Sequence, residues 1–210
     1  MCSDNKTIPT LPNESKINPV ILAAIMTIPL IIGTIIASLI CKFGSTEKYL
    51  SAINIIAEYD AGWLYLALII FGRTIWFLNI FPTKKYKHEV KGGMRANPFF
   101  YKAIGKNAPE DVLVVLEDEG VLGQFNRANR SVHNMIELFG GFVASLFAAG
   151  VVFPFPTLVC VCIFCMGRIL HQSGYSSGYG SHMKGFMMSM MSISTVEGML
   201  AVVAMTAIKS

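Results

Sequence analysis

Long apolar runs separated by short polar stretches dominate the pattern of this chain. Four or five of these runs approach the roughly 20 apolar residues that an α-helix needs to cross a hydrocarbon core about 30 Å thick. We expect membrane spans at about 18–41, 61–81, 123–153, 157–175 and 184–208. The pattern therefore predicts an all-α membrane protein built as a bundle of transmembrane helices.

The first apolar run, from Ile17 to Cys41, contains no charged residue. It is too long for the apolar region of a cleavable signal peptide, so we expect it to stay in the protein as a transmembrane helix covering about 18–43. Residues 1–17 are largely polar and contain two prolines. This composition predicts a flexible tail.

The segments between the spans carry turn and stop signals. Pro82 and the lysines after it are expected to end the second span, and the loop 83–122 is long enough to contain short helices. Pro154 and Pro156 are expected to turn the third span into the fourth. The glycine-rich stretch GYSSGYGSH is expected to turn the fourth into the fifth.

Composition and charge add a predicted topology. Of the 210 residues, 53% are hydrophobic and only 14% are charged, which is not the balance of a soluble protein. The net charge of +4 is concentrated in the loop 83–122, so we attribute it to membrane topology and not to nucleic-acid binding. By the positive-inside rule, the tail and this loop face the cytosol. We predict a multi-pass protein of the endoplasmic reticulum or another organelle membrane, with a cytosolic N-terminus and its C-terminus on the opposite side.

The five cysteines do not have the spacing of a disulfide framework. Three of them, Cys160, Cys162 and Cys165, lie in one apolar run. The Cys162-x-x-Cys165 spacing would suit a redox or metal site, but no polar residue lies beside it. We interpret these residues as packing residues and expect no metal site.

The third span begins with a polar stripe, FNRANRSVHNMIE. At 100° per residue, Arg127, Arg130, Asn134 and Glu137 fall within a sector of about 80°. The stripe rises about 15 Å, roughly halfway through the hydrocarbon, where ionisable groups pair with one another or line a water-filled cavity. The stripe therefore predicts an inward-facing polar site, with a structural network between helices as the alternative.

Two arginines in other spans are expected near the depth of Glu137. Arg73 lies in the second span and Arg168 in the fourth, and we expect one of them to neutralise Glu137. Arg168, His171 and Tyr175 share one face of the fourth span. The third and fourth spans can thus form a polar pocket open to the cytosol, although His171 could equally be a packing residue.

The fifth span begins with His182 and Lys184. Their side chains could attract an anion together with the free N–H groups at the helix start. Glu197 lies about 20 Å further along the helix, too far to share that ligand. We interpret Glu197 as a contact with another helix or subunit.

The polar stripe, followed by an apolar run, AG, prolines and GRxxHxxGY, resembles the MAPEG family, the membrane-associated proteins in eicosanoid and glutathione metabolism. The resemblance covers about 123–185 well and the fifth span loosely. It implies a four-helix membrane domain at 49–210, with a cytosolic loop at about 83–122 and the helix 18–43 as an addition. It also implies a homotrimer that binds glutathione between neighbouring subunits.

By this resemblance, polar residues of the bundle would hold the carboxylates and amine of glutathione. The resemblance gives this role to Arg130, Asn134, Glu137 and Tyr175, with a contribution from Arg73. We add Arg127, Arg168 and His171 to the expected binding residues because they lie on the polar faces of the third and fourth spans. In catalytic members, an arginine near the start of the last helix stabilises the thiolate. Here that region offers His182 and Lys184, which we expect to take this role.

The leading hypothesis is therefore a glutathione transferase or peroxidase that acts on hydrophobic electrophiles or lipid hydroperoxides arriving through the bilayer. The alternative is a non-catalytic, lipid-binding adaptor or a structural subunit of a larger membrane complex, favoured by the missing arginine and the additional span. A proton or ion pathway is a weaker hypothesis, because the polar stripe stops halfway across the membrane. The expected partners are glutathione, a hydrophobic small molecule or lipid, the bilayer and further copies of the chain.

Overall fold

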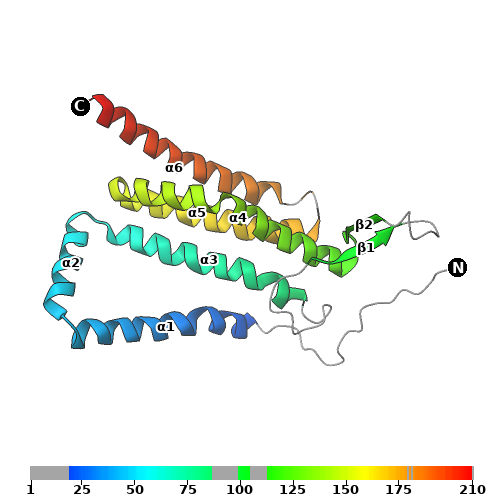
Figure 1. Ribbon diagram of the computed structural model, residues 1–210, viewed down its shortest axis with the longest axis horizontal. Helices are drawn as coiled ribbons and strands as arrows, with labels where there is room; N and C mark the ends of the chain where they lie inside the picture. The colour runs from blue at the N-terminus through cyan, green and yellow to red at the C-terminus, as the bar shows by residue number, and fades with distance from the viewer. Residues whose placement is uncertain (1–18, 87–98, 105–112, 179, 181, 210) are drawn as a thin grey trace.

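The computed structural model describes residues 19–86, 99–104, 113–178, 180 and 182–209, which form six helices and one hairpin (Figure 1). In chain order these are α1 (Pro19–Phe43), α2 (Thr46–Glu58), α3 (Gly62–Tyr86), β1 (Tyr101–Ile104), β2 (Leu113–Leu116), α4 (Gly120–Val152), α5 (Pro154–Ser177) and α6 (Met183–Lys209). Every helix except α2 is long and apolar enough to cross a membrane. The prediction of an all-α membrane protein with these five spans is confirmed. The predicted tail 1–17 lies outside the described residues.

The helices fall into a bundle and an arm. Figure 1 shows α3, α4, α5 and α6 packed side by side, while α1 runs along the bundle beside α3 and is joined to it through α2. The sequence pattern did not predict α2 as a helix. Asp60 turns the chain from α2 into α3 with a left-handed φ of 52°. We call α1 and α2 the arm, and the other four helices the bundle.

The second span ends at Pro82 as predicted, although the helix α3 continues through this proline to Tyr86. A proline inside a helix has no N–H to donate to the carbonyl four residues earlier, which here belongs to Leu78. The buried side chain of Gln172 supplies the missing donor, since its Nε2 donates to the Leu78 carbonyl at 2.7 Å. A residue of α5 thus makes the proline tolerable within α3.

The helices of the bundle approach one another at small residues and aromatic rings. A Cβ placed on Gly167 of α5 would lie 2.6 Å from Ser189 Oγ on α6, so this approach requires a glycine. Phe71, Phe142 and Phe164 join α3, α4 and α5, and the last two rings stack with centroids 4.4 Å apart. All three rings are buried in the main apolar core.

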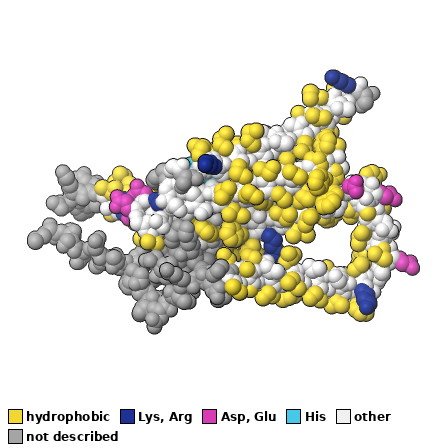
Figure 2. All heavy atoms as spheres, turned by 180° about the vertical axis from the view of Figure 1, so that it is seen from behind, with side chains coloured by type: hydrophobic (Ala, Val, Ile, Leu, Met, Phe, Trp, Pro, Cys, Tyr) yellow, Lys and Arg dark blue, Asp and Glu magenta, His cyan; other side chains and the backbone are white. Residues whose placement is uncertain are grey.

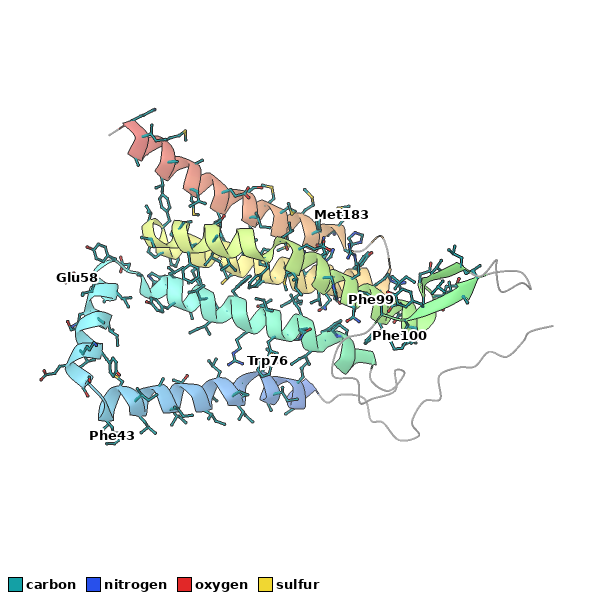
Figure 3. All side chains as sticks on the ribbon, viewed as in Figure 1. Phe43, Glu58, Trp76, Phe99, Phe100 and Met183 are labelled. Carbon is teal, nitrogen blue, oxygen red and sulfur yellow. The ribbon has the colours of Figure 1, made fainter. Side chains whose placement is uncertain are left out.

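The described part of the loop 83–122 contains an antiparallel pair of strands, β1 and β2, and not the short helices that its length would allow. Asn126 of α4 holds its base: Oδ1 accepts from the backbone N–H of Phe100 at 2.9 Å, and Nδ2 donates to the carbonyls of Phe100 and Glu117 at 2.8 and 2.7 Å. Figure 3 shows Phe99 and Phe100 beside the first turns of α4. We call this end of the bundle the hairpin end.

A partly exposed ion cluster joins β1 to the residues that follow β2, outside the spans. Lys102 Nζ lies 2.6 Å from Asp118 Oδ1 and 3.3 Å from Glu117 Oε1. The hydrogen bond to Asp118 raises the pKa of Lys102 above its usual value, and the same bond lowers the pKa of Asp118. The backbone N–H of Glu119 is the largest cause of the lowered pKa of Glu117.

The arm contacts the bundle sparsely. The Nη1 of Arg73 donates to the carbonyl of Met26 in α1 at 3.3 Å, and the guanidinium carbon lies 5.1 Å from the ring centre of Trp76. In Figure 3, Trp76 points from α3 toward α1. The space-filling view of Figure 2 shows an open gap between the arm and the bundle, with a Lys or Arg side chain projecting into it.

Candidate functional site

A cavity of ≈ 240 Å³ lies between α4, α5 and the start of α6. It is lined by Arg130, Ser131, Asn134, His171, Tyr175, His182, Met183 and Phe186. Figure 3 shows Met183 at the first turn of α6, on the hairpin side of the bundle. The lining residues from α4 and α5 are polar, and the two contributed by α6, Met183 and Phe186, form an apolar wall.

The direct junction of α4 and α5 brings the polar residues of both helices together. Phe153 closes α4 and is also the residue that precedes the first turn of α5. The two helices are therefore antiparallel neighbours with no loop between them, and the first half of α4 faces the second half of α5. This pairing places the stripe residues Arg130 and Asn134 opposite His171 and Tyr175.

An aromatic cluster with a serine forms the floor of the cavity. Ser131 Oγ lies 2.7 Å from His171 Nδ1, and both side chains are buried. His171 stacks on Tyr175 with centroids 5.7 Å apart, and His182 meets the two rings edge-on at 5.4 and 5.0 Å. Among the described residues, no group hydrogen-bonds the buried Nδ1 of His182.

Arg168 lies behind the polar wall and does not line the cavity. Only 2% of it is exposed, and its Nη2 donates to the carbonyl of Ser131 at 2.7 Å. Its Nη1 donates to Asn134 Oδ1 at 3.2 Å. Because the amide oxygen of Asn134 is taken up by Arg168, its NH₂ group is the part left to donate to a ligand. Arg168 therefore orients a cavity residue.

The predicted neutralisation of Glu137 by Arg73 or Arg168 is wrong for the described chain. Glu137 Oε1 accepts from Arg130 Nη1 at 3.2 Å, and both side chains are more than half exposed. Arg168 points into the wall between α4 and α5, and Arg73 faces α1. The helical spacing brought Arg130 and Glu137 to one face two turns apart, which the search for partners in other helices overlooked.

Three further predicted residues lie outside the cavity lining. Arg127 joins α4 to its surroundings, with Nη1 donating to the Asp118 carbonyl at 2.6 Å and Nε to the Tyr175 carbonyl at 3.1 Å. Lys184 is exposed at the start of α6, and Arg73 lies in the contact with the arm. Of the two candidates for thiolate stabilisation, the structure thus brings His182 and not Lys184 to the cavity.

Sequence reasoning missed Ser131, Met183 and Phe186 as lining residues. A signal for Phe186 was present, because it follows His182 by four residues, and its ring lies 5.8 Å from His171. Ser131 directly follows Arg130 and lies at the edge of the polar stripe, outside the sector that we considered. Its pairing with His171 depends on how α4 and α5 pack, which a single helix does not reveal.

Comparison with known proteins gives one match. The model of the MAPEG family matches residues 63–206 of the chain. The match extends from the first turn of α3 into the last turns of α6, so it includes every residue of the cavity and leaves the arm outside. A search of the curated proteins found no match.

Proposed function

The chain belongs to the MAPEG family, the integral membrane proteins of eicosanoid and glutathione metabolism, and on that premise we propose that it is a glutathione-dependent transferase or peroxidase. The observation that carries this proposal is the convergence of Arg130, Asn134, Tyr175 and His182 on one cavity with an apolar wall. Such a site suits a polar thiol on one side and a hydrophobic acceptor on the other.

Glutathione has two carboxylates and an amine, and the polar wall offers matching groups. Arg130 can hold a carboxylate through two parallel hydrogen bonds, and the Asn134 NH₂ group, oriented by Arg168, can donate to the same ligand. Glu137 lies outside the cavity lining, but it is paired with Arg130 and is an acceptor for the ammonium group beside that arginine. We assign these three residues to glutathione binding and Arg168 to positioning.

The chemistry requires the thiolate, because the thiol itself is a poor nucleophile. In our proposal, His182 Nδ1 accepts the thiol proton, and the resulting imidazolium stabilises the thiolate beside it. The sulfur then bonds to the electrophilic atom while the leaving group departs with the bonding electrons. With a lipid hydroperoxide, two glutathione molecules would be oxidised to the disulfide while the hydroperoxide is reduced to the alcohol and water.

The surroundings of the cavity agree with substrates that meet at the membrane. The exposed Met183 and the neighbouring Phe186 offer an apolar approach from the bilayer. We place the hairpin end on the cytosolic side, as the lysine-rich loop predicts, so that glutathione enters from the cytosol. The exposed ion pair of Arg130 and Glu137 needs cover within the membrane, and a homotrimer that binds glutathione between subunits would provide it.

Activity assays on the purified protein in detergent test the proposal. We expect conjugation of a reactive aryl halide or reduction of a lipid hydroperoxide, with thiolate absorbance appearing when glutathione is added. Arg130→Gln should raise KM for glutathione about 10-fold or more, because it removes a charge-assisted contact. His182→Asn should lower kcat about 100-fold, the usual contribution of a proton acceptor.

Lys184→Gln is the matched control, since this exposed cation lies two residues from His182 but outside the cavity lining. This substitution should change KM for glutathione and kcat by less than about 2-fold. A large loss of activity with Lys184→Gln would mean that Lys184, and not His182, stabilises the thiolate. The absence of both activities and of thiolate absorbance would contradict the enzymatic proposal.

One observation favours the second candidate, a non-catalytic lipid-binding adaptor. The start of α6 offers no arginine, and its Lys184 is exposed and does not line the cavity. An adaptor would bind glutathione or a lipid without turnover. Calorimetric binding together with unchanged aryl halide and hydroperoxide would support this alternative.

A further inference from the structure

Two opposite charges lie deep in the spans, away from the cavity. Arg73 of α3 makes one long hydrogen bond, to the Met26 carbonyl, and packs against Trp76. Glu197 of α6 is exposed, and no described residue forms a hydrogen bond or ion pair with it. Ionised side chains at membrane depth almost always face an opposite charge, a polar group or water. Glu197 therefore calls for a partner that the described chain does not supply, and the one carbonyl bonded to Arg73 leaves its positive charge without an opposite charge among the described residues.

The two charges lie at matching depths. Arg73 is eleven residues after Gly62, the first residue of α3, and Glu197 is twelve residues before Lys209, the last residue of α6. At 1.5 Å per residue, they are about 16 and 18 Å from these helix ends. Figure 1 shows both ends at the same side of the bundle, opposite the hairpin. Each charge is therefore near the middle of a hydrocarbon core about 30 Å thick.

The two residues cannot reach each other within one chain, because they face outward on opposite sides of it. The inward face of α3 is marked by the buried Ala67, Phe71 and Thr74, and Arg73 points about 140° away from the mean direction of the buried residues of α3. Glu197 points about 110° away from the buried seam of α6. In Figure 1, α4 and α5 lie between α3 and α6.

We propose that Arg73 of one copy forms an ion pair with Glu197 of the next copy, with α6 of that copy lying against α3 at the gap between arm and bundle. The guanidinium has donors to spare for a carboxylate, and charge and depth are complementary. The contact joins two different surfaces, so its repetition around an axis closes a ring of copies. The gap in Figure 2 is open to such a neighbour.

The same contact would extend toward the cavity. Phe186, which lines the cavity, lies within about 20° of Glu197 on the helical wheel of α6. A neighbour seated on this flank would therefore border the opening of the cavity. The ion pair does not depend on glutathione chemistry, although the assembly of copies is common to it and the proposed function. Tests that measure assembly alone keep the two proposals separable.

Charge reversal is the first test, with the full chain in detergent or nanodiscs and the assembly mass measured by native mass spectrometry. Arg73→Glu and Glu197→Arg should each shift the population to single copies, because each places like charges together. The double variant carrying both changes should restore the assembly. Lys209→Glu at the end of α6 and Glu58→Arg at the end of α2 reverse exposed charges far from the middle of the membrane, and they serve as controls that should leave assembly unchanged. The proposal would be overturned if the single variants assemble normally, or if the double variant folds but remains monomeric.

Cross-linking decides the question if a single variant does not fold. Two differently tagged copies, one with Arg73→Cys and one with Glu197→Cys, are coexpressed in a background where Cys2, Cys41 and Cys162 are serine. Oxidation in the membrane should join the two tags in one product. A matched pair of Leu66→Cys and Glu197→Cys, with Leu66 on α3 about two turns nearer the helix start, should cross-link at least about 10-fold less. Failure of the first pair to link, or equal linking by both pairs, would contradict the assigned contact.

Discussion

The arm and the bundle use apolar residues in opposite ways. The α1 span has a mean hydropathy of 2.4, yet none of it is buried inside the chain, whereas the α5 span has a lower value of 1.6 and half of it is buried. Exposed apolar surface carries no penalty in lipid, so helices associate through close packing and polar contacts. Apolar content thus identifies what crosses the membrane, while glycines and buried polar groups identify what packs.

The largest expected effect comes from placing a side chain in the close contact between α5 and α6. A Cβ on Gly185 would collide with the backbone of His171, so Gly185→Leu should separate α5 from α6 and destabilise the protein by about 3 kcal/mol or more. Gly33→Leu is the matched change in the arm, where nothing lies within 4 Å of the new Cβ. It should alter stability by less than about 0.5 kcal/mol. Thermal unfolding in detergent measures both, and equal effects would remove the distinction between arm and bundle.

A second test concerns the proline in α3. Gln172→Met removes the donor to the Leu78 carbonyl and should cost about 1–2 kcal/mol, because that carbonyl is left without a partner. Pro82→Ala restores a backbone donor to the same carbonyl, so in this background Gln172→Met should cost less. Pro29→Ala in the arm is the control background and should leave the cost of Gln172→Met unchanged. If Gln172→Met costs the same free energy of unfolding with and without Pro82→Ala, the Gln172 side chain does not compensate for the proline.

A third, smaller effect is expected at the base of the hairpin. Asn126→Leu deletes the hydrogen bonds to Phe100 and Glu117, so amide exchange in residues 113–116 should accelerate about 10-fold. Asn54→Leu in α2 changes an exposed asparagine of the arm and should leave this exchange unaltered. Mass spectrometry of peptides from the hairpin measures the rates. Unchanged amide exchange with Asn126→Leu would mean that β1 and β2 stay paired without the hydrogen bonds of Asn126.

The smallest expected effect is the response of the hairpin to pH. The pKa values of Glu117 and Asp118 are lowered from their ordinary values of 4.5 and 3.8. Carboxylates of this kind stabilise the folded state above their unfolded pKa, and the stabilisation is lost as pH falls through the lower folded values. The amide hydrogen-exchange rate of the hairpin, corrected for the intrinsic pH dependence of exchange, should therefore be constant from pH 5 to 8 and rise below about pH 4. Lys102→Gln should flatten this response, which is modest because the cluster is exposed.

The spans were predictable because the bilayer imposes their length. The expected run 123–153 and the helix Gly120–Val152 differ by only a few residues. The span ends at Pro82 as expected, but the continuation of the helix past this proline was not predictable, because the missing donor comes from Gln172, ninety residues later in the chain. The helix α2 and the hairpin lie outside the spans, where the sequence pattern is weaker.

The site was predictable as a location and less so as a set of contacts. The helical spacing of the stripe correctly brought Arg130 and Asn134 to a common face that meets His171 and Tyr175. The partner of Glu137 and the orientation of Lys184 depend on helix rotation and on the path into α6, which periodicity in one helix does not determine. Arg168 belonged to the right helix face but lies behind the wall, because its side chain reaches the Ser131 carbonyl.

The absence of a loop at Phe153 has a consequence for how the protein is made. The first half of α4 carries too many charged and amide groups to leave the translocon alone at low cost. Because α5 follows without a break, the two can partition into lipid together as a helical hairpin, with Arg168 already bonded to the α4 backbone. Insertion of the polar first half of α4 into the membrane would then depend on α5, the next helix in the chain.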